Sequence, residues 1–131
     1  MKNEKFSVRK RIRSFGYAFN GLKIMLKEEH NSRIHLFFTA IVVAFMLIFR
    51  FTLVEYALLV LAIGLVFMAE LFNSALENLA DHISPDRHIN IKKVKDLSAA
   101  AVLVSALAAF AIGCLILGPK LINIWEFMRK I

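Results

Sequence analysis

The stretch Ala69-Glu70-Leu71-Phe72-Asn73-Ser74-Ala75-Leu76-Glu77-Asn78-Leu79-Ala80-Asp81 decides the fold of this chain. It continues an apolar run that begins at Tyr56, so the two together predict one membrane-crossing helix over residues 56–81. Glu70, Asn73, Glu77 and Asp81 are spaced 3, 4 and 4 residues apart. This spacing places them on one helix face, within a sector of about 80°. Because a charged side chain at the bilayer centre costs on the order of 2.5–3.5 kcal/mol, the stripe indicates a functional site.

The composition is that of an integral membrane protein. The 131 residues allow one domain, and 59% of them are hydrophobic, against about 45–50% in soluble domains. The formal net charge is nevertheless +7, which is typical of apolar spans flanked by basic anchors. The chain has one cysteine, so a disulfide within the chain is excluded.

An amphipathic helix is predicted over residues 7–30. Its apolar positions recur every three or four residues, and most basic residues lie off that stripe. These apolar positions are Val8, Ile12, Phe15, Phe19, Leu22 and Leu26. A basic amphipathic helix next to apolar spans is expected to lie in the plane of the membrane interface.

Three transmembrane helices are predicted over residues 34–52, 56–81 and 97–118, with a tight turn at residues 51–55. The sequence Ser84-Pro85-Asp86 is expected to end the second span, because proline lacks an amide donor and constrains the residue before it. Residues 82–96 are polar and are predicted to form a loop, and Pro119 is expected to end the third span.

Basic residues set the expected orientation. Residues 1–34 hold nine Lys and Arg, and the predicted loop 82–96 holds four more. The remaining four are Arg50, Lys120, Arg129 and Lys130. The positive-inside rule therefore predicts a cytoplasmic N-terminus and a cytoplasmic loop. Glu77 and Asp81 would then lie at the cytoplasmic interface, with Glu70 deeper in the membrane.

From these residues alone two functions remain open. Carboxylates near a basic loop suit a metal-bridged polyphosphate, since Mg²⁺ takes one or two carboxylates plus phosphate oxygens. Glu28 or Glu29 could add a carboxylate from a second segment. Alternatively, Glu70 could be the intramembrane carrier of a small proton or cation transporter. The chain has neither a P-loop nor the protein-kinase motifs.

Three segments resemble the prokaryotic diacylglycerol kinase family, which includes the similar undecaprenol kinases. Residues 70–81 resemble that family's E-x-x-N-[ST]-A-[IL]-E-x-x-x-D signature. Residues 95–103, Lys-Asp-Leu-Ser-Ala-Ala-Ala-Val-Leu, resemble its K-D-x-x-[AS]-A-A-V-L motif. Residues 16–23, Gly-Tyr-Ala-Phe-Asn-Gly-Leu-Lys, resemble its G-Y-x-x-x-G-[LI]-[KR] motif. The resemblance covers nearly the whole chain in order.

The resemblance implies an all-α integral membrane fold, with a surface helix, three transmembrane helices and a homotrimeric bundle. Its active sites would lie between neighbouring subunits. It implies transfer of the γ-phosphoryl group of ATP, with Mg²⁺, to diacylglycerol, giving phosphatidic acid, or to undecaprenol, giving undecaprenyl phosphate. The expected setting is the bacterial inner membrane, with no nucleic-acid partner.

The resemblance also implies roles for individual residues. Glu70 matches the general base, Glu29 and Glu77 match the metal ligands, and Asp81 is expected to support the site. The expected ATP-binding residues are Lys10, Tyr17, Glu29, Asn73, Glu77, Asp86, Arg87, His88, Lys95 and Asp96. The expected lipid-substrate residues are Ser14, Phe15, Phe19, His35, Glu70 and Ala99.

Three positions depart from the family's usual residues. Lys10 stands where Arg is frequent, which keeps the charge but loses the bidentate fork. His35 resembles the undecaprenol-kinase-like members, whereas the diacylglycerol kinases often carry an acid there. Val94 replaces a small residue before the Lys-Asp pair, and nothing in the sequence explains this change.

Overall fold

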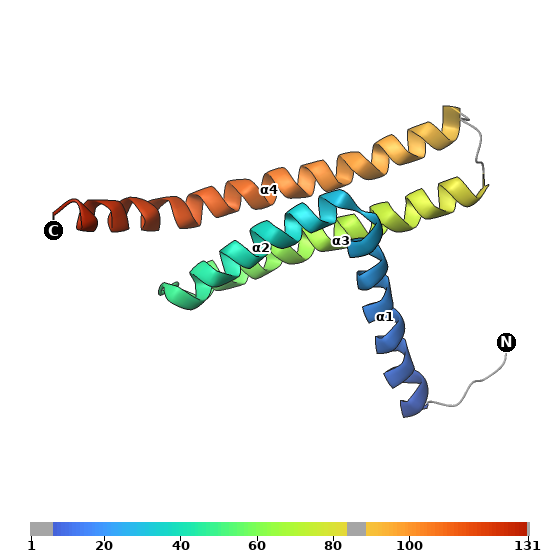
Figure 1. Cartoon of the computed structure of the whole chain (residues 1–131), viewed down its shortest axis with the longest axis horizontal. Helices are drawn as coiled ribbons and strands as arrows, with labels where there is room; N and C mark the ends of the chain where they lie inside the picture. Colours follow the sequence, from blue (N-terminus) through green and yellow to red (C-terminus); the bar gives the residue numbers. More distant parts are fainter. Residues whose placement is uncertain (1–6, 84–88, 131) are drawn as a thin grey trace.

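A computed structural model of the chain describes residues 7–83 and 89–130. These residues form four helices: α1 (Val8–Glu28), α2 (His30–Ile48), α3 (Leu53–Ile83) and α4 (Ile89–Met128). Helices α2, α3 and α4 are long and apolar enough to cross a membrane. The predicted all-α membrane class is therefore confirmed. Figure 1 shows these three helices running along one another, with α1 leaving them at a steep angle.

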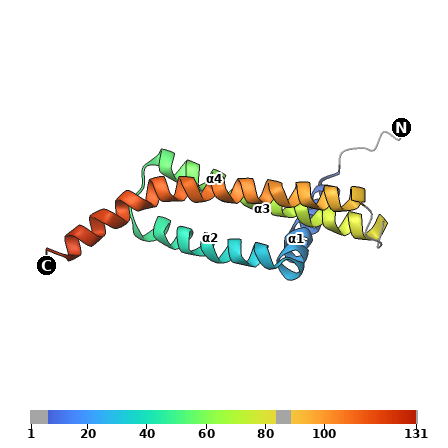
Figure 2. The same ribbon diagram turned by 90° about the horizontal axis from the view of Figure 1, so that it is seen from above.

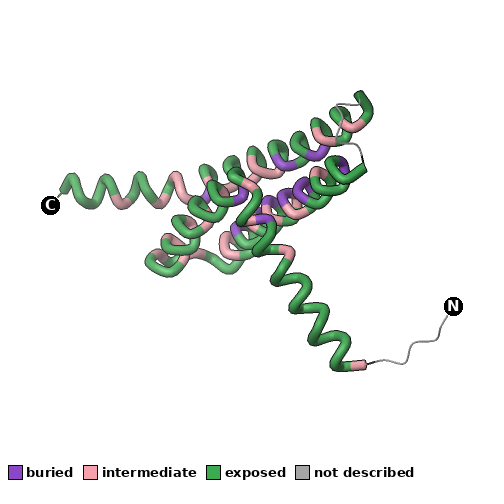
Figure 3. Tube along the Cα trace, turned by 45° about the vertical axis from the view of Figure 1, so that its right-hand side comes forward, coloured by how far each residue is buried: buried purple, intermediate pink, exposed green. Residues whose placement is uncertain are grey.

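The predicted surface helix ends two residues early, because the backbone is extended at Glu29 (φ −95°, ψ 120°). The chain turns there, and the first span begins at His30 rather than at residue 34. Met25, which is 1% exposed, anchors α1 where it contacts α2 and α3. The first half of α1 is exposed on all sides (Figure 3). Its apolar side chains therefore find no partner within the described part of the chain.

The turn between the first two spans lies at residues 49–52 instead of 51–55. Thr52 and Glu55 start α3 as a capping box. The Thr52 amide donates to Glu55 Oε2 (2.6 Å), and the Glu55 amide donates to Thr52 Oγ1 (3.3 Å). The second span therefore begins at Leu53 and extends to Ile83, beyond the predicted limits of residues 56 and 81.

Helix α3 holds most of the buried side chains of the described residues, which Figure 3 shows as purple segments along its length. Its 31 residues correspond to about 46 Å, while a bilayer hydrocarbon core is about 30 Å thick. One end of α3 must therefore extend beyond the hydrocarbon region. Helix α4 returns alongside it in the opposite direction (Figure 1).

The prediction of a loop over residues 82–96 is wrong for residues 89–96, which form the first two turns of α4. Their polar composition is compatible with a helix, and Lys92 forms an i,i+4 ion pair with Asp96 there. The prediction that Pro119 ends the last span is also wrong, because α4 continues to Met128. Proline removes one helical hydrogen bond and bends a helix without ending it. Figure 2 shows that α4 changes direction toward its C-terminal end.

A cluster around Lys120 joins the C-terminal part of α4 to the α2–α3 turn. Lys120 Nζ lies 3.3 Å from Glu55 Oε1, donates to the Arg50 carbonyl at 3.2 Å and sits 4.5 Å from the centre of the Phe51 ring. Across the same turn, the Tyr56 hydroxyl donates to the Met46 carbonyl at 2.8 Å. These contacts fix the end of the bundle opposite to α1.

Candidate active site between the first three helices

Glu70 is the most deeply placed charged residue of the acidic stripe. Its side chain is 1% exposed, although it lies near the middle of α3. Its described contacts come from the first two turns of α2. Ser32 Oγ donates to Glu70 Oε2 at 2.9 Å, and His35 Nε2 lies 3.3 Å from Glu70 Oε1. Oε1 is buried and has no partner of hydrogen-bond geometry among the described residues, so it keeps an unused capacity to accept a hydrogen bond.

Glu29 and Glu77 form a second acidic group, close to where α1 meets α2. The extended backbone at Glu29 places its side chain near α3. Burial raises the pKa of Glu29, and the neighbouring charge of Glu77 raises it further; the Ser74 hydroxyl acts in the opposite direction. Two carboxylates held this close together repel each other when both are ionised. A cation bound between them would remove this repulsion.

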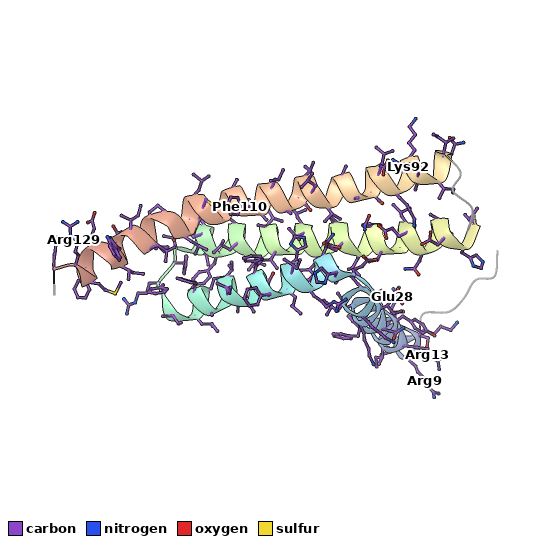
Figure 4. All side chains as sticks on the ribbon, turned by 45° about the horizontal axis from the view of Figure 1, so that its top comes forward. Arg9, Arg13, Glu28, Lys92, Phe110 and Arg129 are labelled. Carbon is purple, nitrogen blue, oxygen red and sulfur yellow. The ribbon has the colours of Figure 1, made fainter. Side chains whose placement is uncertain are left out.

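Two amides of α3 hold the acidic residues in place. Asn73 Nδ2 donates to Glu77 Oε1 at 3.1 Å, which the i,i+4 spacing allows. Asn73 Oδ1 is buried and has no hydrogen-bond partner in the described chain. Asn78 Nδ2 contacts Glu28 Oε2 at 3.4 Å and also donates to the Ser74 carbonyl at 2.9 Å. Glu28 therefore belongs to the junction of α1 with α3, where Figure 4 labels it.

Helix α4 adds a cation to the site. Lys95 Nζ lies 2.6 Å from Asp81 Oδ1, and it is also close enough to Glu77 and Glu29 to interact with their charges. The neighbouring Asp96 is exposed and pairs with Lys92 instead. The predicted pair Lys95-Asp96 is thus divided, with Lys95 contacting the acidic stripe and Asp96 contacting Lys92.

An apolar groove of about 560 Å³ runs between α2, α3 and α4, with His35 among the residues that line it. Because His35 also contacts Glu70, the groove adjoins the buried carboxylate. The remaining lining is almost entirely apolar and extends along α4 to Leu121. A lipid chain is the kind of ligand that such a lining accommodates.

The structure brings some predicted site residues together and separates others. Glu29, His35, Glu70, Asn73, Glu77, Asp81 and Lys95 gather around α3. Lys10, Ser14, Phe15, Tyr17 and Phe19 lie on the exposed part of α1. Figure 4 shows Arg9 and Arg13, from the same part of α1, remote from the other helices. Ala99 is exposed on α4, and Asp86, Arg87 and His88 lie outside the described residues.

Sequence reasoning did not identify Ser32, Ser74 or Asn78. Ser32 is 0% exposed and lies three residues after Glu29 and three before His35. Side chains three residues apart on a helix share a face, so this spacing could have marked Ser32. Ser74 and Asn78 adjoin Asn73 and Glu77 in the stripe, but the sequence carries no sign that they contact Glu29 and Glu28.

The acidic residues of the site can supply only some of the ligands that a metal ion needs. Within residues 7–83 and 89–130, no group of three or more His, Cys, Asp or Glu side chains could hold a metal by itself. Glu29 and Glu77 nevertheless supply two neighbouring carboxylates, and oxygen donors are the ligands that Mg²⁺ prefers. A Mg²⁺ ion that arrives with a polyphosphate needs no more than two such ligands from the protein.

Comparisons with known proteins identify relatives of this chain. Residues 16–117 match the model of a family described as prokaryotic diacylglycerol kinase. The diacylglycerol kinase of Synechocystis is 36% identical over 110 residues, which span 82% of this chain and 63% of the relative. The undecaprenol kinase of Bacillus subtilis is 31% identical over 120 residues, covering 92% of this chain and 98% of the relative. The diacylglycerol kinase of Haemophilus influenzae is 32% identical over 94 residues, 72% of this chain and 80% of the relative.

Proposed function

Since this chain belongs to the prokaryotic diacylglycerol kinase family, we propose that it is a lipid kinase that transfers the γ-phosphoryl group of ATP to a membrane lipid alcohol. The lipid is of the diacylglycerol or undecaprenol type, as the names of the relatives suggest. One observation carries the proposal. The buried carboxylate of Glu70, with one oxygen unpartnered among the described residues, lies two turns along α3 from the acidic pair of Glu29 and Glu77, and its neighbour His35 lines an apolar groove.

Glu70 is suited to act as the general base. Its Oε1 is free of hydrogen bonds among the described residues and lies beside His35, and His35 lines the groove. A lipid with its chain in the groove would bring its hydroxyl to this oxygen. Glu70 takes the hydroxyl proton while the lipid oxygen forms a bond to the γ-phosphorus; the bond to the β-phosphate oxygen breaks, and ADP leaves.

The nucleotide is proposed to bind around Glu29, Asn73, Glu77 and Lys95. Phosphoryl transfer depends mainly on positioning and on neutralising phosphate charge. Mg²⁺ held by Glu29 and Glu77 would supply part of that neutralisation. Lys95 supplies a further positive charge, and the buried Asn73 Oδ1 supplies an unpartnered acceptor. The acidic stripe alone is also compatible with a transporter function, but membership of a kinase family supports the enzyme function.

The active enzyme is proposed to be a homotrimer whose sites lie between subunits. The expected ligand-binding residues Lys10, Ser14 and Tyr17 lie on the part of α1 that leaves the other helices (Figure 1). A site that needs them together with Glu77 would have to combine α1 of one subunit with α3 of another. This arrangement would also cover apolar side chains of α1.

The protein crosses a membrane several times, and we propose that this is the bacterial inner membrane, with the N-terminus in the cytoplasm. The distribution of Lys and Arg supports this orientation. The candidate site lies at the same end of the bundle as α1, so it would face cytoplasmic ATP. The steep angle of α1 to the spans is compatible with a helix lying on the membrane surface.

Purified protein in nanodiscs, supplied with radiolabelled ATP and Mg²⁺, tests the proposal. Diacylglycerol and undecaprenol are offered separately in otherwise identical discs. We expect transfer of the γ-phosphate to at least one lipid, with loss of transfer when Mg²⁺ is chelated. Glu70→Gln is the matched control, because it preserves the size of the side chain and removes the basic oxygen.

Absence of phosphorylated lipid with both acceptors, in a folded preparation, would exclude the proposed activity. Proton or cation flux into liposomes without ATP would instead support a transporter. Retention of full transfer in Glu70→Gln would exclude Glu70 as the base while leaving the kinase activity in place.

A further inference from the structure

Ser32 and Glu70 form a hydrogen bond that is buried on both sides. Ser32 is 0% exposed and Glu70 is 1% exposed, and the distance from Ser32 Oγ to Glu70 Oε2 is 2.9 Å. The two residues are separated by 38 positions and belong to α2 and α3. A hydrogen bond to a carboxylate in a buried site is stronger than one between neutral groups at the surface.

Other serines of the described chain bond differently. Ser14, Ser98 and Ser105 each donate to a backbone carbonyl of their own helix, at distances of 3.1, 3.0 and 2.8 Å. That is the usual partner for a helical serine. Ser32 instead donates to a side chain of another helix. Its hydroxyl therefore orients Glu70 in addition to satisfying its own hydrogen-bonding need.

The two oxygens of Glu70 are in different environments. Oε2 accepts the Ser32 hydrogen bond, while Oε1 lies beside His35 without a hydrogen bond from the described residues. The terminal torsion of a glutamate has a broad preference, so the carboxylate plane is not fixed by its own rotamer. The bond to Ser32 supplies the missing constraint and keeps Oε1 beside His35, which lines the groove.

We propose that Ser32 is a positioning residue for the reaction: it holds Oε2 so that Oε1 faces the lipid hydroxyl. This inference rests on the proposed kinase function, because it gives Ser32 a role only if Glu70 is the base. General-base catalysis requires the accepting atom within hydrogen-bond reach of the proton. Loss of the constraint should therefore slow turnover without weakening nucleotide binding, since Ser32 has no described contact with Glu77 or Lys95.

The experiment compares Ser32→Ala, Ser32→Thr and the control Ser105→Ala with the unchanged protein in the same nanodiscs. Ser105→Ala also removes a helical hydroxyl, but one that bonds within α4. We expect Ser32→Ala to lower kcat about tenfold with KM for ATP unchanged, because small misplacements of reacting groups reduce rates strongly. Ser32→Thr keeps the hydroxyl and should stay within about threefold of the unchanged protein, as should Ser105→Ala.

Infrared spectroscopy supplies a readout that does not depend on turnover. The carboxyl bands of Glu70 are identified by their loss in Glu70→Gln. We expect these bands to shift in Ser32→Ala and to keep their positions in Ser32→Thr and in Ser105→Ala. A thermal melt of each variant confirms that it is folded.

The outcomes separate the two hypotheses. If the unchanged protein phosphorylates lipid and Ser32→Ala matches Ser105→Ala in both kcat and spectrum, the role of Ser32 is overturned while the kinase function stands. An equal drop in kcat for Ser32→Ala and Ser32→Thr, with unshifted bands, also overturns it. If the unchanged protein phosphorylates neither lipid, both the function and the role of Ser32 are overturned.

Discussion

Lys95 Nζ lies 2.6 Å from Asp81 Oδ1, and this ion pair joins α4 to α3 one turn beyond Glu77. The Asp81 side chain is 65% exposed and that of Lys95 is 33% exposed. Exposed ion pairs contribute about 0–1 kcal/mol to stability. The pair therefore contributes little to stability, and its main effect is to position the Lys95 ammonium near Glu77 and Glu29.

We expect Asp81→Asn to raise KM for ATP several-fold and to change kcat less, because Lys95 loses the partner that directs it to the site. Steady-state kinetics with ATP varied at saturating lipid provides the measurement. Glu126→Gln is the control, since it also removes one carboxylate charge, from an exposed position near the C-terminal end of α4. If the two changes raise KM for ATP equally, the cause is a general change of charge and not the placement of the Lys95 ammonium.

Glu70 and Glu77 should differ in which kinetic constant they control. They are seven residues apart, about 10 Å along the helix axis, and Glu70 contacts α2 whereas Glu77 lies near Glu29. Glu70→Gln should lower kcat by about 10²–10⁴-fold with KM for ATP nearly unchanged. Glu77→Gln should both lower kcat and raise KM for ATP. The measurement varies ATP and lipid separately, and a rise mainly in KM for ATP with Glu70→Gln would contradict its assignment as the base.

Stability without metal should depend on the ionisation of Glu29. The pKa of Glu29 is raised from its ordinary value of 4.5 by burial and by Glu77. The folded chain then keeps this proton to a higher pH than the unfolded chain. The resulting stabilisation is complete below the ordinary value and is lost as the pH rises through the raised pKa. Melting temperatures measured with a chelator, from about pH 4 to about pH 8, should fall over this window.

Glu29→Gln should reduce that pH dependence, because the glutamine side chain does not titrate. Glu28→Gln is the matched control, since Glu28 precedes it and is exposed. Identical pH profiles for the unchanged protein and Glu29→Gln would show that Glu29 is not responsible. Added Mg²⁺ should stabilise the unchanged protein more at the upper end of the window, where the carboxylates are ionised.

The cluster around Lys120 should stabilise the end of the bundle opposite to the candidate site. Lys120→Met removes the contacts with Glu55, with the Arg50 carbonyl and with the Phe51 ring. We expect the melting temperature to fall by roughly 2–5 °C. A double-mutant cycle with Glu55→Gln isolates the ion pair, and strict additivity of the two single changes would show that the pair contributes nothing.

Helix α1 should lie on the membrane with the face of Phe15 toward the lipid and that of Asn20 toward water, because the two positions are about 140° apart around the helix. Spin labels at either position, in a Cys114→Ser background, measure this directly by their collision rates with oxygen and with a water-soluble nickel complex. Oxygen is enriched in the bilayer, so we expect it to be the more effective relaxant at position 15. The nickel complex should be the more effective one at position 20. Equal accessibility at both positions would argue against a surface-bound helix.

The sequence by itself determined the membrane class and the acidic stripe. Hydropathy over some twenty residues is a local property, so three apolar spans were evident from composition. The spacing of Glu70, Asn73 and Glu77 also lies within one helix, where 3.6 residues per turn fix the shared face. The motifs around residues 16–23, 70–81 and 95–103 led to the family that the comparisons identify.

Helix ends were less predictable, because local chemistry that composition does not express decides them. The capping box of Thr52 and Glu55 was present in the sequence, and its spacing could have placed the start of α3. The break at Glu29 and the continuation of α4 through Pro119 carry weaker signals. Polar residues 89–96 extend a helix whose far end is apolar, so polarity alone was a poor guide to a loop.

Only the tertiary structure decided which residues meet across helices. Ser32 with Glu70, Lys95 with Asp81 and Lys120 with Glu55 each join two different helices. Such pairs depend on the rotation and the axial register of one helix against another. Those two quantities follow from the packing of side chains such as Met25, Leu59 and Ala62. Spacing along a single helix contains neither of them, and this is why the partners of Glu70 became known only once α2 was packed against α3.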